Sequence, residues 1–110
     1  MNIGIIGAGA IGATLGGHMT LGGASVVLFD PWEEHVNVMK ERGLLIDGVQ
    51  GEHRVKVDAR HIGELTTLTN GFDIVIVAVK SYDTKWAVDL MSPYLLDKGY
   101  FISPQNSINE

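Results

Sequence analysis

The sequence predicts a doubly wound α/β fold built on a mostly parallel sheet. Three observations support this prediction: β-branched runs alternate with helical stretches, a glycine-rich segment joins the first run to the first helix, and 110 residues suffice for one hydrophobic core. The prolines are dispersed and no change of composition marks a linker, so we expect one domain over residues 1–110.

The first strand and helix are expected to meet at a glycine-rich turn. Residues 2–6 form a short apolar run, as a buried parallel strand does. Residues 10–21 are mostly apolar and precede a glycine pair, which predicts a helix. Gly16 and Gly17 inside this helix each cost about 1 kcal/mol relative to alanine, which indicates a helix pressed close to the sheet.

A second strand and helix follow. Residues 25–29 are β-branched and aromatic, which favours a strand. We place Pro31 at the first position of the next helix, which carries two glutamates in its first turn and ends with Arg42 before Gly43.

The rest of the chain predicts a hairpin and one further strand, helix and strand. Residues 44–47 and 53–57 flank a glycine-containing turn and indicate an inserted β-hairpin. Residues 73–79 are too rich in β-branched side chains and too short for a helix, and they form the strongest predicted strand. Residues 84–91 predict a helix and residues 100–103 a short strand.

Composition excludes several classes of protein. A net charge of −5 offers no basic field for nucleic acid. The absence of cysteine excludes a disulfide framework, and the four histidines lack the spacing of a metal site, so we assign no metal. The first basic residue is Lys40 and no apolar run approaches about 18 residues, so we expect a cytoplasmic protein with no membrane partner.

The clearest functional signal is the segment Gly7-Ala8-Gly9-Ala10-Ile11-Gly12, which fits G-x-G-x-x-G between a predicted strand and a predicted helix. Gly7 permits the tight turn, Gly9 lets the backbone approach a pyrophosphate, and Gly12 lets the helix pack on the strand. Free amides at the helix start would face the anion. A glycine-rich turn without a nucleotide is the alternative, and the context favours a dinucleotide site.

Asp30 follows the second strand, 18 residues after Gly12, close to the position of the acid that binds the ribose hydroxyls. It favours NAD over NADP, because a carboxylate repels a 2′-phosphate and no basic residue follows before Lys40. An aspartate that only caps the second helix is the alternative, and the two roles are compatible.

Other candidate residues follow later strands or begin helices. Lys80 leaves the carboxyl end of a predicted central strand, where ligands of such sheets bind, although a solvated lysine would look the same. Gln105 and Asn106 follow the last predicted strand and are turn residues when taken alone. Trp32 and Trp86 begin helices among polar neighbours, which favours core or partner contact over cofactor stacking.

Three segments also form a recognisable pattern: MNIGIIGAGAIGA at residues 1–13, VAVKSYDT at residues 77–84 and QNSINE at residues 105–110. Together they resemble the amino-terminal domain of the ketopantoate reductase (2-dehydropantoate 2-reductase) family. The first segment is common to many Rossmann oxidoreductases, whereas the other two are more specific at these spacings. The resemblance covers essentially the whole chain, and the predicted hairpin matches it.

The resemblance implies an NAD(P)-dependent enzyme that reduces a small 2-keto acid. It implies that the glycine segment holds the pyrophosphate, that Lys80 contacts the adenosine side, and that Asn106 lies near the nicotinamide and substrate. The family mostly uses NADPH and has a basic or neutral residue where this sequence has Asp30. The sequence departs from the family there and at Ser107, which replaces the usual glycine after Gln-Asn.

The family's general acid is a lysine on a second, helical domain, so we expect no catalytic residue in these 110 residues and interpret them as the cofactor half of a larger reductase. Apolar surface left uncovered would then favour self-association. Two alternatives are a stand-alone NAD-binding or sensing module without catalysis, and a methyltransferase that uses S-adenosylmethionine.

Overall fold

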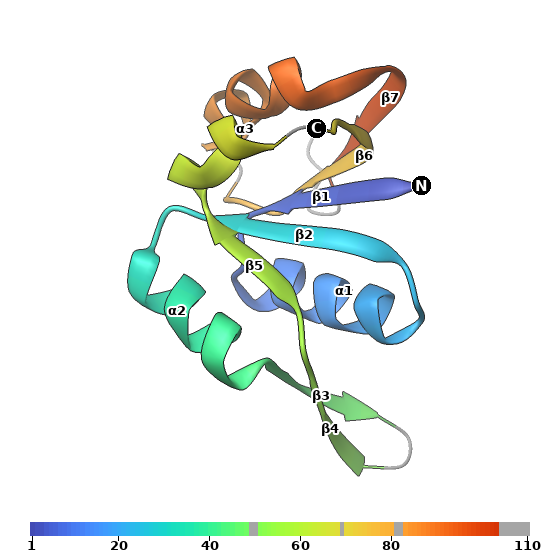
Figure 1. Ribbon diagram of the computed structural model, residues 1–110, viewed down its shortest axis with the longest axis vertical. Coiled ribbons are helices and arrows are strands. Elements are labelled where there is room, and N and C mark those ends of the chain that lie inside the picture. The colour runs from blue at the N-terminus through green and yellow to red at the C-terminus, as the bar shows by residue number, and fades with distance from the viewer. Residues whose placement is uncertain (49–50, 69, 81–82, 104–110) are drawn as a thin grey trace.

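A five-stranded sheet in the order β5-β2-β1-β6-β7 forms the centre of the molecule (Figure 1). The computed structural model describes residues 1–48, 51–68, 70–80 and 83–103. Every pairing in this sheet is parallel, with Ile5 of the central strand opposite Leu28 on one side and Ile76 on the other. The strands are β1 Asn2–Ile6, β2 Ser25–Asp30, β5 Asp58–His61, β6 Phe72–Val77 and β7 Leu95–Ile102.

Helices cover both faces of the sheet, as a doubly wound fold requires (Figure 1). Consecutive residues of a strand point to opposite faces, so Ile5 and Ile6 enter different cores. The core that contains Ile5 is closed by α1 (Ala10–Leu21) and α2 (Glu33–Arg42). The core that contains Ile6 is closed by α3 (Thr84–Met91) and the short helix η1 (Ile62–Thr67). The predicted fold class is therefore confirmed.

The inserted hairpin is also present, as a separate two-stranded antiparallel sheet of β3 (Leu44–Gly48) and β4 (Gly51–Val55). It packs against α1, where a Cβ added to Gly17 would overlap the Ile46 side chain. A Cβ at Gly16 would lie 2.7 Å from the Leu28 side chain in the sheet. The glycine pair in α1 therefore allows two close contacts, one with the sheet and one with the hairpin.

The prediction that Pro31 occupies the first helical position is wrong. Helix α2 begins at Glu33, and Trp32 is its N-cap residue with extended backbone angles (φ −90°, ψ 103°). The Asp30 side chain accepts a hydrogen bond from the Trp32 amide at 2.8 Å, which keeps this segment out of the helix. Glutamates still occupy the first turn of α2, as expected.

Three differences concern strands. Strand β5 was not predicted, because its sequence Asp-Ala-Arg-His contains no apolar run, and neither was η1 after it. Strand β7 begins at Leu95 rather than at residue 100; Asp97 and Lys98 interrupt the apolar pattern of its first half, so the sequence does not predict that half as a strand. Strand β6 ends two residues earlier than predicted, although the Ala78 amide still donates to the Ile6 carbonyl at 2.9 Å.

Two further features complete the description. A short helix, η3 (Ser92–Tyr94), containing a proline, joins α3 to β7. Among the described residues, no helix has the length and apolar content needed to cross a membrane.

Candidate functional site

The loop between β1 and α1 has the geometry expected of its glycines. Gly7 has a φ of +101°, and a Cβ there would lie 2.9 Å from the Val79 side chain. Its amide donates to the Phe29 carbonyl at 2.8 Å, so the turn is anchored on β2. A Cβ at Gly12 would overlap the Gly7 carbonyl oxygen. Side chains at these two positions would therefore disrupt the loop.

Gly9 faces open space instead. A Cβ there would meet no atom within 4 Å, and no side chain caps the helix that starts at Ala10. Ala10 and Ile11, in the first turn of α1, are exposed. The first amides of α1 are thus open to an acceptor from solvent, as at helix starts that bind anions.

Asp30 lies at the end of β2 and faces the glycine loop. Its Oδ2 accepts a hydrogen bond from the Ala8 amide at 2.8 Å, while its Oδ1 accepts one from the Trp32 amide, also at 2.8 Å. The Ala8 amide is therefore engaged by Asp30 rather than open to a phosphate. The carboxylate fastens the loop to the start of α2, and it remains only partly buried.

His35 holds the other side of the same peptide segment. Its Nε2 lies 2.6 Å from the Ala8 carbonyl oxygen, although 27 residues separate the two in sequence. Asp30 and His35 together bind both the N–H and the C=O of Ala8. No sequence pattern predicts this contact of His35, because it exists only once α2 packs beside the loop.

His61 supports the segment after Asp30. Its Nδ1 accepts a hydrogen bond from the Gly63 amide at 3.0 Å, so in the neutral ring Nε2 carries the proton and donates to the Pro31 carbonyl at 2.9 Å. This role of His61 was not predicted, because the residue lies in the unpredicted strand β5, directly opposite Asp30.

Glu64 connects His61 to α2. Its carboxylate accepts a hydrogen bond from the His61 amide at 3.0 Å and forms an ion pair with Lys40 at 3.2 Å. The His61 amide, followed by the Lys40 ammonium, holds the pKa of Glu64 below its ordinary value. The basic residue nearest to Asp30 in the downstream sequence is therefore engaged with another acid.

Lys80 follows the end of β6, next to the glycine loop. The preceding residues Ala78 and Val79 lie against Gly7, so the chain leaves the sheet beside the loop. Lys80 is exposed, and its carbonyl accepts a hydrogen bond from the Asp83 amide at 2.8 Å. Gln105 and Asn106 lie outside the described residues.

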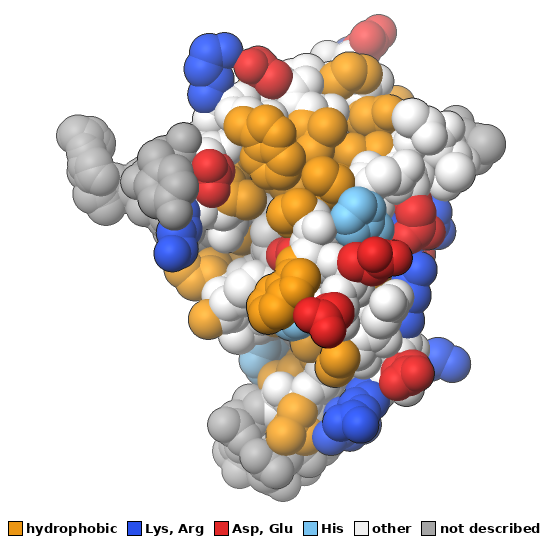
Figure 2. Space-filling model, turned by 90° about the vertical axis from the view of Figure 1, so that its left-hand side faces the viewer, with side chains coloured by type: hydrophobic (Ala, Val, Ile, Leu, Met, Phe, Trp, Pro, Cys, Tyr) orange, Lys and Arg blue, Asp and Glu red, His pale blue; other side chains and the backbone are white. Residues whose placement is uncertain are grey.

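The glycine loop, Asp30 and Lys80 lie at the edge of the sheet where the parallel strands end. Figure 2 views that side of the molecule and shows hydrophobic side chains beside acidic side chains and histidines. Among the described residues, no cluster of three potential metal ligands is found. The edge therefore offers a glycine loop, a partly buried carboxylate and exposed aromatic surface.

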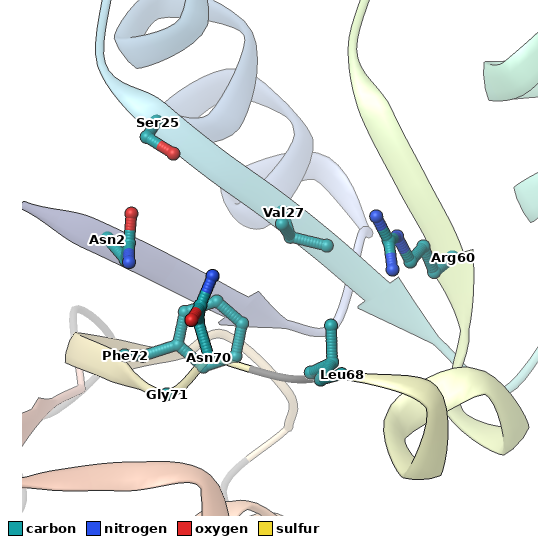
Figure 3. A pocket seen from close by; sticks show the side chains of 8 residues that line it. All are labelled: Asn2, Ser25, Val27, Arg60, Leu68, Asn70, Gly71 and Phe72. Atoms are coloured by element: carbon teal, nitrogen blue, oxygen red, sulfur yellow. The ribbon is translucent and has the colours of Figure 1, made fainter.

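A separate pocket of about 200 Å³ lies at the opposite ends of the strands, near the first residues of β1, β2 and β6 (Figure 3). Arg60 lines it and forms an ion pair with Asp58, with Nε and Oδ1 3.0 Å apart. This pocket is remote from the glycine loop, because the loop lies at the carboxyl ends of the strands.

Sequence and structure comparisons agree on the relatives of this chain. The family model described as ketopantoate reductase PanE/ApbA matches residues 3–110. A 2-dehydropantoate 2-reductase from Pyrococcus abyssi is 35% identical over 111 residues, covering 98% of this chain and 34% of the relative. One from Streptococcus pyogenes serotype M1 is 35% identical over 77 residues, covering 70% of this chain and 24% of the relative.

Solved structures have the same fold. A PanE/ApbA family ketopantoate reductase from Ralstonia eutropha aligns with a TM-score of 0.78 and 32% identity, covering 92% of this chain and 33% of that one. A D-mandelate dehydrogenase in a ternary complex with NADH and anilino(oxo)acetate aligns with a TM-score of 0.83 and 27% identity, covering 99% and 34%. The chain spans between about a quarter and a third of the length of these relatives, and it belongs to the ketopantoate reductase family of oxidoreductases.

Proposed function

We propose that this chain binds a nicotinamide dinucleotide and forms the cofactor-binding part of a reductase for small 2-keto acids. The observation that carries the proposal is the glycine loop with open helix amides, held to the end of β2 by Asp30. A neighbour of the same fold has NADH bound, which supports the same ligand here. The family membership supports the reaction class.

The binding part of the proposal is tested by titrating NADH into the wild-type chain and a Gly12→Ala variant. The variant should lose binding, because its Cβ would overlap the Gly7 carbonyl and distort the loop. Gly22→Ala is the matched control, since a Cβ at Gly22 would lie 3.5 Å from the His18 carbonyl and its φ is −77°. Equal affinity in all three proteins would refute a pyrophosphate site at this loop.

We propose further that NAD is preferred over NADP. Asp30 would accept hydrogen bonds from the ribose hydroxyls, whereas a 2′-phosphate brings about −1.5 to −2 charges to the same place. Glu33 and Glu34 add negative charge in the first turn of α2, and Lys40 is paired with Glu64. NADP is the alternative that the family resemblance favours, with Lys80 as the candidate cation beside the loop.

The proposed reaction is reduction of the keto group of a 2-keto acid to a hydroxyl group. A bound reduced nicotinamide would supply the hydride, and the substrate oxygen would take up a proton. We propose that the proton donor lies outside these 110 residues, as the family resemblance implies. The chain's own contribution is then to bind and orient the dinucleotide at the edge of the sheet.

This division of labour has a direct test. The chain is incubated with NADH and either ketopantoate or phenylglyoxylate, and NADH absorbance is followed. We expect binding of NADH with turnover no faster than the uncatalysed background. Turnover above that background would contradict a proton donor outside these residues.

A second candidate is a stand-alone NAD-binding or sensing module without catalysis, which is favoured by the lack of a predicted catalytic residue among these 110 residues. The gene sequence distinguishes the two candidates. A helical domain encoded in frame downstream would exclude the sensing module.

A further inference from the structure

Trp32 is an exposed aromatic residue on a firmly held backbone. Its side chain lies at the carboxyl edge of the sheet and is 62% exposed. Its amide donates to Asp30 Oδ1 at 2.8 Å, and its carbonyl accepts from the Val36 amide at 3.1 Å. The preceding residue, Pro31, is itself held by His61. The indole therefore projects into solvent from a backbone whose position is fixed by hydrogen bonds.

The indole is also supported from one side. The rings of Trp32 and His35 have centroids 5.9 Å apart and planes inclined by 37°. His35 is in turn bound to the Ala8 carbonyl, so indole, imidazole and glycine loop form a connected series. This arrangement limits the freedom of the indole and leaves much of its surface open.

The position of Trp32 relative to Asp30 indicates what this surface binds. In a dinucleotide, the ribose whose hydroxyls would donate hydrogen bonds to Asp30 also carries the adenine ring, which is bonded directly to the sugar. An aromatic side chain two residues beyond Asp30 is thus within reach of that base. We propose that the Trp32 indole is the stacking surface for the adenine ring of the dinucleotide, an inference that rests on the proposed function.

This inference replaces the expectation that Trp32 contacts the core or a partner protein. A core position is excluded by the 62% exposure of Trp32. Stacking requires an open, flat and pre-positioned ring, and bases stack on aromatic side chains without needing sequence-specific hydrogen bonds. It predicts that adenine nucleotides lacking nicotinamide bind here, whereas nicotinamide mononucleotide alone does not use this surface.

The two tryptophans of the chain allow a fluorescence test. Trp86→Phe leaves Trp32 as the single tryptophan, and Trp32→Phe leaves Trp86, which lies on α3 and is 42% exposed. ADP-ribose is titrated into both variants. We expect its binding to change the emission of the Trp86→Phe variant and to leave that of the Trp32→Phe variant nearly constant.

Calorimetry with ADP-ribose supplies the second measurement. Trp32→Ala should bind it about 10-fold more weakly, Trp32→Phe should retain most of the affinity, and Trp86→Ala should bind like the wild type. Circular dichroism verifies that each variant is folded.

The outcomes separate this inference from the proposed function. Undiminished ADP-ribose affinity in Trp32→Ala overturns the adenine stack while leaving dinucleotide binding intact. Failure of the wild-type chain to bind both ADP-ribose and NADH overturns both. Reduced self-association of Trp32→Ala with unchanged affinity would instead show that Trp32 contacts a second copy of the chain, which also overturns the inference.

Discussion

Asp30 combines a structural role with the capacity to bind a ligand. Each of its oxygens accepts one backbone hydrogen bond, from Ala8 and from Trp32. An ionised carboxylate offers about four acceptor positions, so two remain for the ribose hydroxyls. Asp30 can therefore both support the start of α2 and bind the ribose, although Trp32 is the N-cap residue of α2.

The structural role predicts a loss of stability in Asp30→Asn, even without cofactor. The amide group of asparagine would place an N–H donor against one of the two backbone donors that the carboxylate now accepts. We expect the free energy of unfolding, measured by urea denaturation, to fall by about 1–3 kcal/mol.

Glu33→Gln is the control for this substitution, because Glu33 is exposed in the first turn of α2. It should change the free energy of unfolding by less than about 0.5 kcal/mol. Equal stability of Asp30→Asn and Glu33→Gln would show that the hydrogen bonds of Asp30 contribute little.

At the scale of elements, the glycines of α1 determine how closely the helix approaches its neighbours. Gly16 faces the Leu28 side chain in the sheet, and Gly17 faces Ile46 in the hairpin. Alanine has the better helix propensity by about 1 kcal/mol, which would stabilise an isolated helix. In this fold a methyl group at Gly17 has no room unless the buried Ile46 side chain, or the hairpin that carries it, moves.

We therefore expect Gly17→Ala to destabilise the protein by about 1–3 kcal/mol, the usual cost of overpacking, despite its gain in helix propensity. Gly22→Ala, at the end of the same helix, should be close to neutral because its Cβ makes ordinary contacts. Thermal denaturation of the two variants compares them directly. A Gly17→Ala variant more stable than the wild type would show that the hairpin adapts at little cost.

Glu64 connects η1 to α2 and makes stability depend on pH. Its pKa is lower in the folded chain than its ordinary value of 4.5, chiefly through the His61 amide. A group with a lowered folded-state pKa contributes stability that is present above its unfolded pKa and is lost as pH falls through the folded pKa. Its contribution should therefore be complete near neutral pH, begin to fall near pH 4.5 and be lost once the pH is below the lowered pKa of the folded chain.

Glu64→Gln tests this dependence through denaturation curves between pH 3 and pH 7. The variant should lose less stability on acidification than the wild type, and its cost at neutral pH should stay below about 1 kcal/mol because the ion pair is solvent-accessible. Glu41→Gln, on the exposed surface of α2, should follow the wild-type curve. Parallel curves for all three proteins would contradict the link between Glu64 and acid stability.

At the scale of the whole molecule, most of the fold could be predicted because its strands are apolar and its helices have clear ends. β1 and β2 and the helices after them follow this rule. β5 does not, because a four-residue polar strand at the sheet edge is stabilised by pairing with β2 rather than by its own pattern. Its absence from the prediction also concealed His61 and η1.

The candidate site divides in the same way. The glycine loop and Asp30 could be predicted because their spacing along the chain reflects the geometry of one strand–helix–strand unit. The contact of His35 with the Ala8 carbonyl could not be predicted, since it depends on how α2 packs beside the loop. Patterns along the sequence describe local structure well, and contacts between distant segments require the folded chain.

The edge strand β7 leads to a prediction about assembly. The side chains of Tyr100 and Ile102 are exposed on this strand, and β7 is an edge strand of the described sheet, so its outer side presents backbone N–H and C=O groups. Such an edge favours pairing with another chain. We expect concentration-dependent self-association by light scattering, reduced in Tyr100→Lys, and a monodisperse monomer at high concentration would contradict this expectation.

We propose that the carboxyl edge of this sheet binds a dinucleotide and that Asp30 selects NAD. Parallel calorimetric titrations with NADH and NADPH test both statements. The salt concentration is kept moderate and equal in the two titrations, because the contribution of the 2′-phosphate is electrostatic and salt screens it. We predict tighter binding of NADH, with the preference reduced in Asp30→Asn. Tighter binding of NADPH to the wild-type chain would contradict the role of Asp30 and favour Lys80 as the residue that determines the cofactor.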